Sequence, residues 1–123
     1  MSSRYRGAQR AMQMLDLTTE TTGTTVRLAL GGELDIASAA QVEQELMRIE
    51  GLEPATILLD LRELSFMDST GLRIIVAADG RAREQSRRLV LVKGPEAVQR
   101  IFHMTRLDER LEIVDDPAAV EAS

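Results

Sequence analysis

A short polar segment, Asp68-Ser69-Thr70-Gly71, contains two neighbouring hydroxyl groups beside an acid and a glycine. It follows a continuous apolar run and precedes an amphipathic stretch, so we expect it where a buried strand passes into a helix. Helix N-termini leave backbone N–H groups unpaired, and Asp68, Ser69 or Thr70 could cap them. A phosphate on Ser69, carrying about −1.5 to −2 charges, could also bind there and deter a docking partner. The segment therefore predicts a helix cap, a phosphorylation switch, or both.

A second polar segment, Gly31–Asp35, follows an earlier strand. By itself it is typical of a strand end followed by a helix cap, with Asp35 or Ser38 as the capping residue. Both segments leave their strands at the carboxyl end, where binding sites gather in open α/β sheets. We therefore expect the two segments to form one contiguous surface.

Catalytic chemistry has little support in this sequence. Ser69 lacks the G-x-S-x-G pattern of hydrolases, and the one histidine, His103, lies far along the chain among apolar neighbours. Asp60 and Asp68 suggest Mg²⁺ only weakly, because no Walker lysine accompanies them. Cysteine is absent, which excludes disulfides and thiolate ligands. We therefore expect no catalytic residues, no metal site and no cofactor, and do not expect an enzyme.

The elements that position these segments can be read from hydrophobic periodicity. Alternating or continuous apolar residues predict five strands, and residues spaced three and four apart predict helices. The strands are expected at 15–17, 26–30, 56–61, 89–92 and 111–114, and the helices at 36–50, 72–85 and 96–104, with a short helix or frayed end at 117–122. This order predicts a single α/β domain with a mixed four- to five-stranded sheet and helices mainly on one face.

Composition narrows the class of protein further. The chain has 123 residues, a formal net charge of −5 and 2% aromatic residues, which argues against nucleic-acid binding. No apolar stretch approaches the roughly 20 residues of a membrane span, so we expect a cytoplasmic protein without membrane contact. Residues 1–14 carry three arginines and no acid, and we interpret them as a flexible tail before a domain at 15–123.

Four motifs in the same order resemble the anti-sigma factor antagonists, small bacterial STAS-domain proteins. Phe66–Leu72 is similar to their phosphorylation loop, and Gly32-Glu33-Leu34-Asp35 to their G-E-[LI]-D segment. Ile57–Leu61 resembles their central strand and Ile101–Leu107 their late helix. The resemblance extends from about Leu15 to Val114 and implies a STAS-like fold.

The resemblance also implies a function. Unphosphorylated members bind an anti-sigma factor that is itself a serine kinase, which releases the sigma factor; phosphorylation weakens the complex, and a phosphatase reverses it. Carried over, the acceptor is Ser69, with Thr70 as second choice. The partner surface would comprise Gly32, Glu33, Asp35, Asp68, Ser69, Thr70, Gly71, Leu72 and Arg73. The alternative is a STAS-type scaffold or transport-associated subunit without a phosphorylation switch, and a homodimer is open in both cases.

Two residues depart from the family pattern. Arg73 and Arg106 stand where many relatives have glycine. Arg73 lies early on the expected helix, close to the partner surface. It either alters the choice of partner or pairs with a phosphate.

Overall fold

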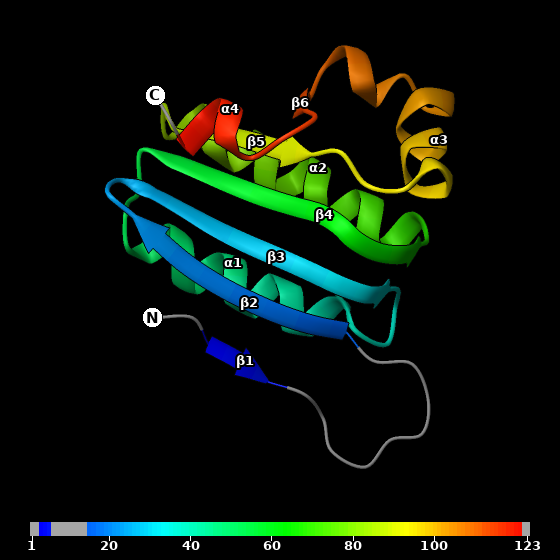
Figure 1. Ribbon diagram of the computed structural model, residues 1–123, viewed down its shortest axis with the longest axis horizontal. Helices are drawn as coiled ribbons and strands as arrows, with labels where there is room; N and C mark the ends of the chain where they lie inside the picture. Colours follow the sequence, from blue (N-terminus) through cyan, green and yellow to red (C-terminus); the bar gives the residue numbers. More distant parts are fainter. Residues whose placement is uncertain (1–2, 6–14, 122–123) are drawn as a thin grey trace.

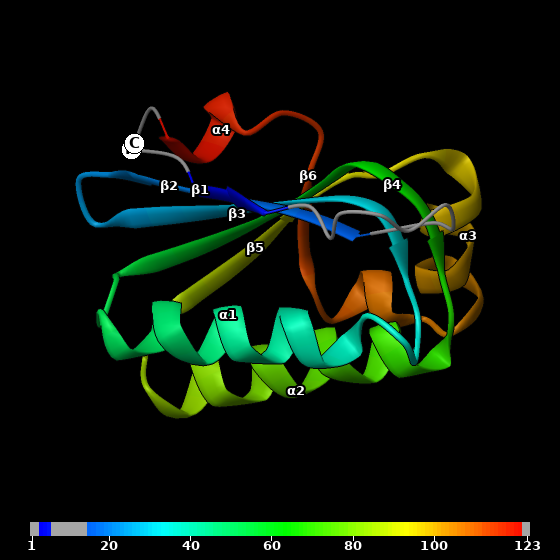
Figure 2. The ribbon, with the colours of Figure 1, turned by 90° about the horizontal axis from the view of Figure 1, so that it is seen from below.

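The architecture is a mixed sheet with two long helices against one face (Figures 1 and 2). The structure, a computed structural model, describes residues 3–5 and 15–121. Along the chain the elements are β1 Ser3–Tyr5, β2 Leu15–Thr22, β3 Thr25–Leu34, α1 Ala39–Gly51, β4 Thr56–Met67, α2 Ser69–Glu84, β5 Arg88–Val92, α3 Glu96–Met104, the 3₁₀ turn η1 Leu107–Glu109, β6 Glu112–Val114 and α4 Ala118–Glu121.

The strands lie in the order β1-β2-β3-β4-β5-β6. The first three are antiparallel, and β3 to β6 are parallel. The mixed α/β sheet is confirmed, with the five expected strands present as β2 to β6. An additional strand, β1, lies within residues 1–14, which we interpreted as a flexible tail, and it pairs with β2. Three residues are too few to show a periodicity, and the rest of that segment lies outside the described residues.

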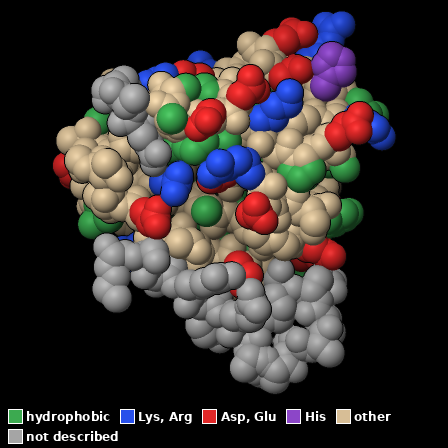
Figure 3. Space-filling view, in the orientation of Figure 1, with side chains coloured by type: hydrophobic (Ala, Val, Ile, Leu, Met, Phe, Trp, Pro, Cys, Tyr) green, Lys and Arg blue, Asp and Glu red, His purple; other side chains and the backbone are tan. Residues whose placement is uncertain are grey.

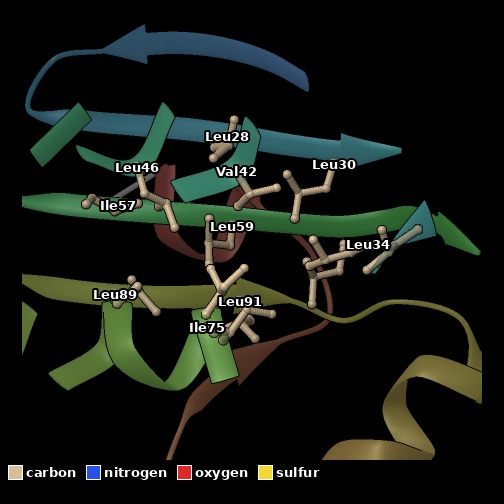
Figure 4. Packing of buried hydrophobic residues seen from close by; sticks show 14 of the residues in the cluster. Leu28, Leu30, Leu34, Val42, Leu46, Ile57, Leu59, Ile75, Leu89 and Leu91 are labelled. Carbon is tan, nitrogen blue, oxygen red and sulfur yellow. The ribbon is translucent and has the colours of Figure 1, made fainter. Parts of the chain in front are cut away.

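The core lies between the sheet and the helices. Apolar side chains of β3, β4 and β5, such as Leu28, Leu59 and Leu91, face α1 and α2 (Figure 4). The predicted apolar face of α1 is buried in full: Ala39, Val42, Leu46 and Ile49. On the opposite side of the sheet, α4 places Val120 in a smaller cluster with Leu58, Val90 and Val92 (Figure 2). No helix in the described part of the chain is long and apolar enough to cross a membrane.

Ion pairs fix α2 against its neighbours. Arg81 donates from Nε and a terminal nitrogen to the two carboxylate oxygens of Glu50 on α1, both at 2.9 Å. Buried Asp79 accepts from Arg83 at 2.8 Å, and Arg83 also donates to the carbonyl of Arg110 beyond η1. Two-point guanidinium–carboxylate contacts restrict orientation as well as distance. These contacts anchor α2 to both α1 and the segment that leads into β6.

Two irregularities bend β4 towards α2. Between Ala29↔Asp60 and Gly31↔Glu63 the strand holds one more residue than β3, and another extra residue lies between Leu64 and Phe66. At the first bulge Asp60 accepts from the backbone N–H of Arg62 at 3.1 Å, and at the second the Ser65 hydroxyl donates to the Gly32 carbonyl at 3.0 Å. Bulges increase bending and twist, and β4 curves round into α2 (Figure 2).

The predicted ends of two strands, β3 and β4, differ from those in the structure. We expected a strand at 56–61 and the next helix from residue 72, whereas β4 runs to Met67 and α2 begins at Ser69. Likewise β3 continues through Gly31 and Gly32 to Leu34. In β4 each extra residue interrupts the apolar pattern, and in β3 the two glycines suggest a turn, so both strands continue beyond the end that the sequence predicts.

Arg62→Gln should destabilise the fold at neutral pH. Burial alone would raise the pKa of Asp60, but hydrogen bonds from the Arg62 side chain and backbone lower it overall. A depressed pKa stabilises the fold above the ordinary aspartate pKa of about 3.9, and this contribution is lost as pH falls through the folded-state value. Urea unfolding should show a loss of about 1–2 kcal/mol at pH 7 and a smaller one near pH 2.5. An equal loss at both pH values would contradict this account.

Candidate functional site

The start of α2 is capped by Asp68 alone. Its Oδ1 accepts from the backbone N–H groups of Thr70 at 2.9 Å and Gly71 at 3.1 Å, while its carbonyl accepts from Leu72 at 3.1 Å. Among the three candidate caps, the carboxylate therefore has the capping role. The expected free N–H donors for a phosphate are already occupied at these three residues, which corrects that part of the prediction.

Of the two neighbouring hydroxyl residues, Ser69 has the more accessible side chain. Ser69 is exposed as the first residue of α2, and within the described residues its hydroxyl has no hydrogen-bond partner. Thr70 is half-buried. An exposed hydroxyl that makes no structural contact can be modified without breaking any interaction of the fold. Ser69 is thus available to another molecule, whereas the adjacent residue, Asp68, caps the helix.

The second polar segment joins the first directly. The backbone N–H of Asp68 donates to the carbonyl of Leu34 at 3.2 Å, next to Asp35. Asp35 in turn accepts from the backbone N–H groups of Ala37 at 3.0 Å and Ser38 at 3.1 Å. The expectation that both segments form one contiguous surface is confirmed. The helix expected from residue 36 begins only at Ala39, because Asp35 stabilises a turn before it.

Gly71 allows the close approach that positions Ser69. A Cβ at this buried residue would lie 2.6 Å from Leu34 Cγ and 2.9 Å from Met67 Cγ. Gly71 therefore packs in the core, which differs from its expected place on the partner surface. The other expected surface residues are half-buried or exposed: Gly32, Glu33, Asp35, Asp68, Thr70 and Leu72 are half-buried, and Ser69 and Arg73 are exposed.

Sequence reasoning missed two apolar side chains beside these segments. Ile36 is 79% exposed and Phe66 46% exposed. Each adjoins one polar segment, Ile36 following Asp35 and Phe66 pairing with Glu33. Isolated apolar residues next to loop acids give only a weak signal. Among the methionines of α1, β4 and α3, Met67 is buried, whereas Met47 and Met104 lie on outward helix faces.

The remaining candidate groups have structural or solvent contacts. His103 is exposed and its Nδ1 lies 3.0 Å from Asp108, as expected for a solvent-facing histidine. Asp60 is buried at the first bulge. No group of three or more potential metal ligands occurs in residues 3–5 and 15–121. Acidic and basic side chains are interspersed on the face seen from the side of α4, without a large patch of one sign (Figure 3).

Gly71→Ala should destabilise the protein by about 1–3 kcal/mol, because Leu34 and Met67 must shift to admit the methyl group. Gly80→Ala is the matched control in the same helix, since a Cβ there meets nothing within 4 Å. That variant should gain about 0.5–1 kcal/mol through helix propensity. Denaturant unfolding measures both. Similar effects of the two substitutions would contradict the close-packing argument.

Asp68→Ala should cost about 1 kcal/mol, since it removes the cap of α2. Asp68→Asn should be nearly neutral for stability, because asparagine caps as well as aspartate does. The pair separates the capping role from the charge at this residue. If thermal unfolding shows both variants equally destabilised, the negative charge rather than the cap stabilises the start of α2.

Comparison with known proteins agrees with this geometry. A family model described as "Mlab, STAS domain" matches residues 17–115. The anti-sigma-B factor antagonist of Listeria monocytogenes is 33% identical over 88 residues, covering 72% of this chain and 77% of the relative.

Two solved structures share the fold. A crystal structure of an anti-sigma factor antagonist from Mycobacterium paratuberculosis has a TM-score of 0.77 at 22% identity, covering 83% of this chain and 86% of that one. The Bacillus cell fate determinant SpoIIAA in its phosphorylated form has a TM-score of 0.68 at 22% identity, covering 86% and 97%. Together with the motifs around Asp35 and Ser69, these matches show that the chain belongs to the STAS domain family and is a homologue of the anti-sigma factor antagonists.

Proposed function

We propose that this protein is an anti-sigma factor antagonist controlled by phosphorylation of Ser69. Its unphosphorylated form binds an anti-sigma factor serine kinase and so releases the sigma factor. Transfer of a phosphoryl group from ATP to the Ser69 hydroxyl switches binding off, and a phosphatase removes the group again. The chemistry belongs to those two enzymes, so the antagonist needs no catalytic residue or cofactor of its own. The proposal places the protein in the cytoplasm, with its partners.

The observation that carries this proposal is the state of the Ser69 side chain. It is exposed, makes no hydrogen bond within the described residues and stands beside a residue that caps the helix in its place. A kinase can therefore reach the hydroxyl, and its modification leaves the cap intact. The names of the relatives support the same function, and SpoIIAA is itself known in a phosphorylated form.

Electrostatics and desolvation explain how a phosphate would release the partner. The surface already carries Asp68 and Asp35, which the Asp68–Leu34 hydrogen bond holds on neighbouring segments. A phosphate adds about two negative charges next to them. A partner docked over Ser69 would have to remove water from this anion, at a cost that grows with its charge. The fold tolerates the charge because it stays in solvent, whereas the complex does not.

The partner surface combines this polar centre with apolar side chains. Ile36 and Phe66 provide exposed apolar area next to Asp35 and Asp68. Leu72, half-buried on the first turn of α2, adds a third apolar contact. Aromatic side chains such as Phe66 are enriched at protein–protein interfaces relative to the rest of the surface. Gly71 contributes by positioning this turn, and Gly32, Glu33, Thr70 and Arg73 complete the proposed surface.

Ser69→Ala should abolish phosphorylation, whereas Thr70→Ala, removing the neighbouring hydroxyl, should leave it intact. Each candidate anti-sigma factor kinase of the same organism is incubated with the chain and ATP, and intact mass spectrometry counts the phosphates. Wild type and Thr70→Ala should gain one phosphate. Full modification of Ser69→Ala at the wild-type rate would reject Ser69 as acceptor.

Ser69→Asp should bind the same kinase at least tenfold more weakly than wild type, a difference of about 1.4 kcal/mol. Ser69→Ala serves as the uncharged control and should bind nearly as wild type does. Isothermal titration calorimetry measures all three. Equal affinities would remove the electrostatic mechanism and favour the alternative, a scaffold or transport-associated subunit that holds its partner constantly. Sedimentation of the free chain tests for a homodimer, which the mechanism does not require.

A further inference from the structure

Arg73 is a cation at the proposed switch that has no partner among the described residues. It is exposed on α2, and no hydrogen bond or ion pair engages its guanidinium within the part of the chain that the structure describes. Other arginines of the fold bind carboxylates, namely Arg48, Arg62, Arg81, Arg83 and Arg88. Arg73 is therefore available to pair with an anion added to this surface.

The spacing on α2 directs Arg73 towards Ser69. Ser69 is the first residue of the helix, and Arg73 follows four positions later on the same face. Side chains at this spacing have Cβ atoms about 5–6 Å apart. Helical side chains lean towards the N-terminus, so the guanidinium extends over the turn that carries the Ser69 hydroxyl.

The start of α2 offers few other donors to a phosphate. The backbone N–H groups of Thr70 and Gly71 already bind the Asp68 carboxylate, and that of Leu72 binds the Asp68 carbonyl. A phosphate on Ser69 would have to displace the cap to use them. A guanidinium, by contrast, presents several N–H donors in a planar fork that matches phosphate oxygens.

We propose, building on the proposed function, that Arg73 binds the phosphate on Ser69 within the same chain. In the unphosphorylated protein the guanidinium is free to contact the partner. Phosphorylation then has two effects on the surface. It adds an anion at Ser69, and it pairs Arg73 with that anion, so that the guanidinium no longer contacts the partner. Arg73 thus takes part in the switch, and its guanidinium holds the phosphate against α2.

The test installs phosphoserine at position 69 by genetic code expansion, so that no kinase or partner is needed. ³¹P NMR at low salt then measures the pKa of the second phosphate ionisation in three proteins: wild type, Arg73→Gln, and Arg73→Gln combined with Ala77→Arg. Ala77 is exposed one turn further along α2, so the double variant restores the net charge at a greater distance from Ser69. The pKa should be lower in wild type than in Arg73→Gln by about 0.3, and the double variant should resemble Arg73→Gln.

A second readout follows the guanidinium itself. In the wild-type protein the Arg73 Nε–H resonance should shift on phosphorylation. It should also stay visible to a higher pH than in the unphosphorylated protein, as expected for a hydrogen-bonded group. Equal phosphate pKa values in all three proteins, or full recovery of the shift in the double variant, would overturn the pairing. Either result would leave the proposed function intact, because the kinase and calorimetry experiments with Ser69 variants do not depend on Arg73.

Discussion

The contact of Gly71 with Leu34 and Met67 is the constraint on which the site depends. A residue without a side chain lets the first turn of α2 rest directly on the ends of β3 and β4. This contact sets the height of the helix start, and the hydrogen bond from Asp68 to Leu34 sets its direction. With both in place, the neighbouring Ser69 side chain is exposed to solvent. The accessible hydroxyl is therefore a consequence of packing beneath it.

The site separates the stability of α2 from the residue that we propose is phosphorylated. Asp68 satisfies the helix start, so the stability of α2 does not depend on Ser69. The separation matters because a regulatory residue must change its charge without altering the protein that carries it. Had Ser69 been the cap, modification of its hydroxyl would have disturbed the helix. In the switch that we propose, phosphorylation would change the charge of the surface and leave the fold unchanged.

Much of this arrangement could be predicted from the sequence because strong periodic signals specify it. The spacing of Val42, Leu46 and Ile49 predicts the buried face of α1, and the run at 57–59 predicts a central strand. The cap and the hydroxyl could not be assigned to separate residues, since Asp68, Ser69 and Thr70 all have suitable side chains.

Long-range pairing explains some of the other differences. The bulges that carry β4 to Met67 and the short strand β1 depend on partners distant in sequence. The exposure of Ile36 has a local cause instead, the turn that Asp35 stabilises before α1, which the apolar spacing of residues 36–50 does not reveal. Strand β4 shows a further consequence of such pairing. Because its two extra residues set which way the last side chains point, loss of a single codon there would exchange the sides of Phe66 and Met67. The number of residues in β4, as well as their types, therefore decides whether the hydroxyl that follows the strand faces solvent.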